Sequence, residues 1–81
     1  MKALIRIDES LWSARVAPEG ILEQWFRPDG AQVVAGEKLA RVQIEGALHE
    51  VTSPAAGQLR VLASAGSVLD PGCVIGQVVP A

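Results

Sequence analysis

The sequence predicts an all-β domain, a flattened β-barrel or sandwich of two roughly four-stranded antiparallel sheets with pseudo-twofold symmetry. Short β-branched runs alternate with turn residues, and no stretch keeps the spacing of an amphipathic helix. An internal repeat predicts the symmetry. The 81 residues are expected to form a single domain, because a chain of this length buries only about 60–65% of its unfolded surface and has no room for a second core.

Six runs are expected to be strands, each bounded by turn signals. They cover residues 4–7, 20–26, 38–44, 47–52, 57–61 and 74–79. Glycine, proline and aspartate separate them, most clearly in the PDG and DPG segments at 28–30 and 70–72. Neighbours on a strand point to opposite faces, so we expect Trp25 in the core and Phe26 half exposed. The segment 9–17 can form either a helical turn or a loop.

The two halves of the chain resemble copies of each other. At an offset of 36 residues, Gly30 matches Gly66, Val33 matches Leu69, Gly36 matches Gly72, Leu39 matches Ile75 and Val42 matches Val78; with one residue slipped, Gly20 matches Gly57. Each copy has a glycine that opens a strand, two further glycines around an apolar residue, and then an alternating strand. Neither copy can bury its apolar face alone, so the pattern predicts two similar sheets packed together.

Charge and composition narrow the classes of partner. Seven basic residues are dispersed singly among nine acidic ones, which gives no footprint for a nucleic-acid backbone. The longest uncharged stretch, residues 73–81, falls far short of the ~20 residues of a membrane span. The single cysteine excludes an internal disulfide, and residues 1–8 hold too short an apolar run for a signal peptide. We therefore expect a cytoplasmic protein without nucleic-acid or membrane partners.

The segment 42–57, VQIEGALHEVTSPAAG, resembles the central hairpin of biotinyl/lipoyl carrier domains. Together with the repeat, the resemblance covers residues 20–79. In that family an acidic residue, a lysine and a small residue form a tight turn, and the lysine is acylated by lipoic acid. The matching residues here are Glu45, Gly46 and Ala47. The resemblance implies a flattened barrel with the hairpin tip exposed, as in acyltransferase components of 2-oxoacid dehydrogenase complexes.

Gly46 stands where the family has its acceptor lysine, and glycine offers no amine for an amide link to a cofactor. We therefore expect no lipoyl or biotin attachment and no other cofactor. Lys38 is about 20 Å from the tip along the intervening strand, and Lys2 lies at the first strand, so neither lysine replaces it. A glycine after Glu45 also makes a good two-residue turn.

No catalytic or metal site is expected, and the protein is not expected to be an enzyme. His49, the only histidine, has no cysteine nearby and is expected on a strand surface. Cys73 follows a turn glycine, without a cationic neighbourhood to activate the thiol. Glu37, Glu45 and Glu50 form no evident paired-carboxylate site.

The expected partner-binding residues are Leu11, Trp12, Glu45 and Gly46. The segment 9–17 matches the loop that in lipoyl domains lies near the acylated tip and contributes to partner recognition. Trp12 can be an exposed binding anchor or can pack over an open end of the barrel, and the sequence leaves both possibilities open.

Three functions follow from these features. The first is a non-catalytic docking or regulatory module associated with a 2-oxoacid dehydrogenase or acyltransferase component. The second is an inert structural domain with an unrelated partner. The third is a genuine lipoyl or biotinyl carrier that uses an atypical attachment residue.

Overall fold

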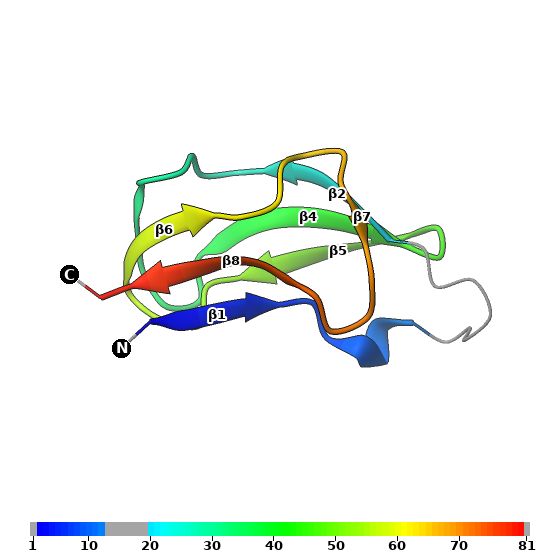
Figure 1. Cartoon of the computed structure of the whole chain (residues 1–81), viewed down its shortest axis with the longest axis horizontal. Helices are drawn as coiled ribbons and strands as arrows, with labels where there is room; N and C mark the ends of the chain where they lie inside the picture. The colour runs from blue at the N-terminus through cyan, green and yellow to red at the C-terminus, as the bar shows by residue number, and fades with distance from the viewer. Residues whose placement is uncertain (1, 13–19, 81) are drawn as a thin grey trace.

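The computed structural model of the chain describes residues 2–12 and 20–80. Within these ranges the chain forms eight strands and one short 3-10 helix. They are β1 (Ala3–Arg6), η1 (Glu9–Leu11), β2 (Gly20–Trp25), β3 (Gln32–Val33), β4 (Lys38–Ile44), β5 (Ala47–Thr52), β6 (Gly57–Val61), β7 (Val68–Leu69) and β8 (Val74–Val79). The longer strands run roughly along the long axis of the molecule (Figure 1).

The strands form two four-stranded antiparallel sheets, with the orders β1-β8-β6-β3 and β5-β4-β2-β7. Each half of the chain lends a short strand to the other half's sheet. Val33 of β3 pairs with Gly57 of β6, and Leu69 of β7 pairs with Gly20 of β2. These two pairings are equivalent under the internal repeat, so the predicted pseudo-twofold, two-sheet fold is confirmed.

All six predicted strands are present, with ends that differ by at most one residue. The two-residue strands β3 and β7 were not predicted as strands. Each contains the apolar residue midway between two repeat glycines, Val33 or Leu69, and both side chains are buried. A strand of two residues has no alternating pattern to detect, so only the repeat marked these positions.

The core lies between the sheets and is filled by inward-facing aliphatic side chains from both. Its fully buried members are Ile5, Ile7, Leu22, Leu39, Val42, Ile44, Leu59, Leu69, Ile75 and Val78. Trp25 packs against this core as expected, although it remains half-buried, and its indole Nε1 donates to the Ala63 carbonyl at 2.8 Å. Phe26 is half-buried, with the Arg41 guanidinium 5.4 Å from its ring centre.

Gly57 is the glycine that leaves the least room for a side chain. A Cβ atom at this position would collide with the carbonyl oxygen of Val79 on β8. Only glycine permits this spacing, which explains why the sequence places a glycine at the start of β6.

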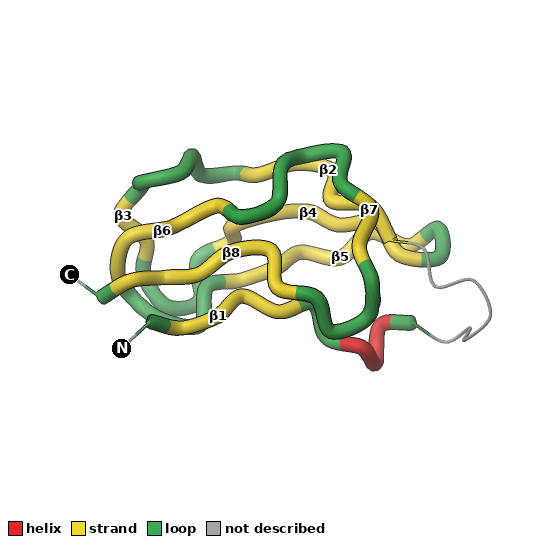
Figure 2. Tube along the Cα trace, viewed as in Figure 1, coloured by secondary structure: helices red, strands yellow, loops and turns green. Residues whose placement is uncertain are grey.

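The hairpin between β4 and β5 lies at one end of the molecule, whereas the start of β1 and the end of β8 lie at the other (Figure 2). Among the described residues, no helix has both the length and the apolar character needed to cross a bilayer.

Candidate functional site

The tip of the β4–β5 hairpin is a two-residue turn. Ile44 pairs with Ala47 and closes the turn, leaving Glu45 and Gly46 between them, both exposed. Their φ angles are 52° and 81°. Positive φ at both central residues is the signature of a type I′ turn, whose twist matches that of the flanking strands. The predicted tight tip is therefore present at the predicted residues.

Backbone conformation gives Gly46 a structural reason to be glycine. A residue with a side chain in the left-handed region costs about 1–2 kcal/mol. Glu45 already occupies that region, and it is the sole non-glycine residue with positive φ in the described part of the chain. The space around the tip is open, because a Cβ atom at Gly46 would meet no atom within 4 Å.

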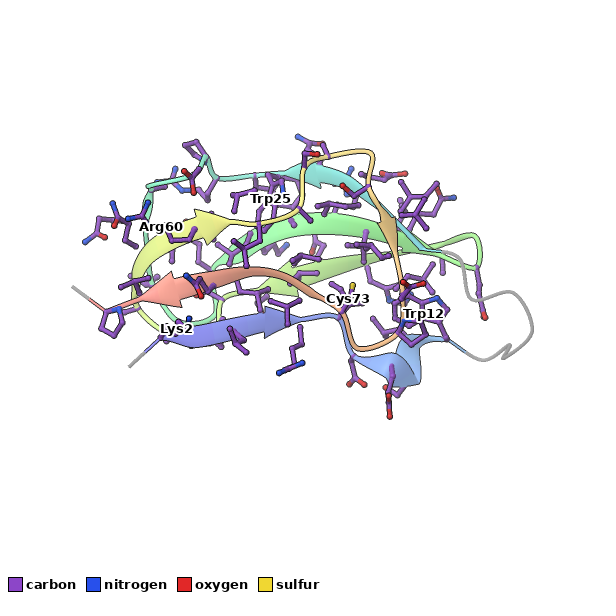
Figure 3. The ribbon with its side chains drawn as sticks, viewed as in Figure 1. Lys2, Trp12, Trp25, Arg60 and Cys73 are labelled. Atoms are coloured by element: carbon purple, nitrogen blue, oxygen red, sulfur yellow. The ribbon has the colours of Figure 1, made fainter. Side chains whose placement is uncertain are left out.

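Both lysines of the chain lie away from the tip. Lys38 begins β4 and pairs with Thr52, at the far end of the hairpin from Gly46. Its Nζ is 3.0 Å from Glu50 Oε1. Lys2 directly precedes β1, at the opposite end of the molecule from Trp12 (Figure 3).

Trp12 is a core residue, and its interpretation as an exposed binding anchor is wrong. Its side chain is 8% exposed and belongs to the hydrophobic core cluster. The ring packs against Gly20, where an added Cβ would lie 3.0 Å from Trp12 Cζ2. Packing over the barrel end, the other possibility, is what the structure shows. Leu11 is half-buried against the same cluster, and residues 13–17 of the expected loop lie outside the described residues.

The four expected partner-binding residues therefore do not form one exposed surface. Gly20, which contacts the Trp12 ring, pairs with Ile44, the last residue before the tip. Trp12 thus supports the base of the hairpin from inside. Its indole Nε1 has no hydrogen-bond partner among the described residues.

The turn before Trp12 is held by a carboxylate cap. Asp8 Oδ1 accepts a hydrogen bond from the Ser10 backbone N–H at 2.9 Å. This backbone hydrogen bond, followed by one with the Ser10 side chain, lowers the pKa of Asp8 below its ordinary value. The cap orients η1, and the Trp12 backbone N–H closes the turn by donating to the Glu9 carbonyl.

The other candidate functional residues contribute to packing and pairing within the fold. His49 pairs with the buried Val42 and is half-buried on the edge strand β5, so it is less exposed than expected. Cys73 is half-buried and packs against the core. Glu37 forms an ion pair with Arg27 at 3.3 Å and accepts the Val34 backbone N–H. Among the described residues, no three His, Cys, Asp or Glu side chains form a group that could hold a metal.

Three exposed apolar side chains of the β5-β4-β2-β7 sheet were not among the predicted site residues. They are Ile21 on β2, Leu48 on β5 and Val68 on β7. In β2 and β5, the sequence feature that could have indicated these residues was an apolar side chain at an outward-facing position. Their alignment into one row depends on strand pairing, which the sequence does not show.

A comparison with protein families supports the fold. The family model of biotin- and lipoyl-binding domains, described as "Biotin-requiring enzyme", matches residues 14–78. The match includes the β4–β5 hairpin, its Glu45-Gly46 tip and all strands except β1, with β8 matched as far as Val78. The chain therefore belongs to the biotin/lipoyl domain family.

Proposed function

We propose that the chain is a biotin/lipoyl-type domain without a cofactor, which acts as a non-catalytic docking or regulatory module for a 2-oxoacid dehydrogenase or acyltransferase component. The observation that carries the proposal is the tip. Glu45 and Gly46 keep the exposed two-residue turn of a carrier hairpin, but the position of the acceptor has no amine.

Two features support loss of attachment over a substitute acceptor. Lys38 is at the far end of β4 and is engaged by Glu50, and Lys2 is near the opposite end of the molecule. An attachment enzyme that docks on the hairpin tip would therefore meet no amine. We also place the protein in the cytoplasm, because its lone cysteine is not part of a disulfide framework typical of secreted small domains.

Intact mass after co-expression tests the absence of a cofactor. The chain is produced with a lipoate ligase and lipoate, and separately with a biotin ligase and biotin. We expect the unmodified mass in both cases. A stoichiometric gain of one lipoyl or biotinyl group would contradict the proposal and favour a carrier with atypical attachment.

Gly46→Lys tests whether the missing amine is the sole barrier. The added side chain enters open space, so the variant should fold, with a loss of about 1–2 kcal/mol from positive φ. Gly46→Ala is the matched control, since it carries the same backbone cost without an amine. Lipoylation of the lysine variant alone would identify Gly46 as the barrier, whereas a folded but unmodified lysine variant would indicate that another feature of the tip has also diverged.

Binding separates the docking module from an inert structural domain. The probes are the purified acyltransferase and 2-oxoacid dehydrogenase components of the source cell, with calorimetry as the readout. Saturable binding to either component supports docking. Absence of binding to both would favour the inert domain with an unrelated partner.

A further inference from the structure

One cross-strand row of the β5-β4-β2-β7 sheet presents apolar side chains to solvent. Leu48 on β5 pairs with Gln43 on β4. Gln43 in turn pairs with Ile21 on β2, and Ile21 pairs with Val68 on β7. Directly opposed residues of antiparallel strands project to the same face, so these four side chains form one row, called the apolar row below. Leu48, Ile21 and Val68 are 57%, 44% and 70% exposed.

The apolar row lies beside the tip and is backed by the core. The Leu48–Gln43 pair directly follows the Ile44–Ala47 pair that closes the turn. On β2, the residue before Ile21 is Gly20, which packs on the buried Trp12 ring from the inner side. The row is therefore presented by four paired strands over a packed interior, so a partner need not order the surface on which it binds.

The internal repeat supplies a control for what the fold itself requires. The equivalent row on the other sheet consists of Lys2, Val79, Gln58 and Gln32. Gln58 pairs with both Val79 and Gln32, and Lys2 directly precedes β1, the strand beside β8. Three of these four side chains are polar or charged. Because the two rows occupy equivalent places, the apolar side chains of the first row are not demanded by the architecture.

An exposed carboxylate borders the apolar row. Glu23, on the strand of Ile21, is exposed and forms no ion pair among the described residues. Arg41, a described cation on this sheet, lies opposite Glu50 and over the Phe26 ring. A partner that matched this surface would therefore carry basic groups beside its apolar ones.

The size of the surface argues against a second copy as the occupant. A stable interface buries about 800 Å² on each side, whereas the row offers three apolar side chains across about 14 Å of sheet. Two copies stacked on this face would also bring two Glu23 carboxylates into one interface. A row of this extent instead fits a single short segment of another protein.

We propose that the apolar row binds a segment of a partner protein in which aliphatic side chains are flanked by lysine or arginine. This inference rests on the proposed function, because it assigns the docking of that module to named residues.

Site-specific photo-cross-linking in the source cell tests the surface directly. A benzophenone amino acid replaces Leu48 in one variant. In the control it replaces Leu4, which is exposed on the outer face of the other sheet. We expect a specific cross-link from position 48 and none from position 4, with a cross-linked peptide that contains aliphatic and basic residues. A peptide from a second copy of this chain, an acidic peptide, or no specific product at position 48 would overturn the inference.

Affinity for the purified cross-linked protein tests each part of the row. Ile21→Thr and Val68→Thr keep β-branching and should each weaken binding at least tenfold, with unchanged melting temperatures, whereas Leu4→Thr should bind as the parent does. Glu23→Gln should reduce the salt dependence of binding. Equal affinity of both row variants and the parent would refute the inference even if a dehydrogenase or acyltransferase component binds. Loss of affinity for an unrelated partner would instead support the row and contradict the proposed function.

Discussion

Replacing Trp12 by alanine should cost the domain a large part of its stability. The indole is 8% exposed within the core cluster, and truncation of a buried tryptophan costs about 3–5 kcal/mol. A domain of this length has a total stability of about 4–12 kcal/mol. At about 4–8 °C per kcal/mol for a domain this small, the melting temperature should fall by at least about 12 °C.

Three further variants separate ring packing from other effects of the substitution. Trp12→Phe keeps the six-membered part of the ring and removes an Nε1 donor that lacks a described partner, so it leaves a smaller cavity and should cost less than Trp12→Ala. Gly20→Ala should destabilise the parent, because its methyl group would lie 3.0 Å from Trp12 Cζ2. In the Trp12→Ala background the contact with the ring is gone and Ile44 Cγ1, at 3.2 Å, is the closest remaining neighbour, so the same methyl group should cost less than in the parent.

Urea denaturation followed by far-ultraviolet circular dichroism measures the parent and all four variants, since it does not depend on tryptophan fluorescence. If the free energy of unfolding of Trp12→Ala is within about 0.5 kcal/mol of the parent's, a magnitude typical of surface substitutions, the ring does not support the hairpin. Additive costs of the Trp12 and Gly20 changes would likewise refute the contact between them.

Three other predictions test the core, the close approach at β6 and the η1 cap. Val42→Asp and Val78→Asp should each cost more than about 4 kcal/mol in urea denaturation, because each places an unpaired charge in the core. Gly57→Ala should abolish cooperative melting, since its methyl group would strike a β8 carbonyl, whereas Gly66→Ala, in open space, should cost about 1–2 kcal/mol. Folding lowers the pKa of Asp8, so the stabilising contribution of this carboxylate is present above the unfolded pKa and is lost as pH falls through the folded pKa. In an NMR titration the Ser10 amide signal, which reports this cap, should move below about pH 4. The same signal should stay fixed in Asp8→Ala.

Most of the architecture follows from local patterns in the sequence. The longer strands are visible because β-branched runs end at glycine and proline. The offset between Gly30 and Gly66 marks the two copies. Strand β3 pairs with β6, and β7 pairs with β2, so each of these short strands joins the sheet of the other half. Two residues are too few to indicate a strand by alternation. Their pairing is a tertiary property. The repeat therefore marked Val33 and Leu69 as equivalent residues but did not predict which strands they pair with.

The candidate site was likewise predictable only in part. The tip was predictable because a two-residue connection between two strands fixes its own register, Ile44 against Ala47. The burial of Trp12 was not, because it depends on the missing side chain of Gly20, which leaves room for the ring. Ile21 and Val68 become neighbours only through the β2–β7 pairing, so no periodicity along the chain could join them.

The base of the hairpin is required by the fold, whereas the apolar side chains of the apolar row are not. The base of the hairpin is held by its structural connections, since Ile44 pairs with Gly20, and Gly20 in turn receives the Trp12 ring. These contacts require the base of the hairpin whether or not its tip carries an amine, so the base alone does not argue for function; the proposed docking function rests on the exposed turn at Glu45 and Gly46. The exposed side chains of the apolar row make no comparable demand on the fold, because the repeat-related row is mostly polar. A docking function for this domain is therefore better sought at the exposed tip and on the outer face of the sheet beside it than in chemistry at Gly46.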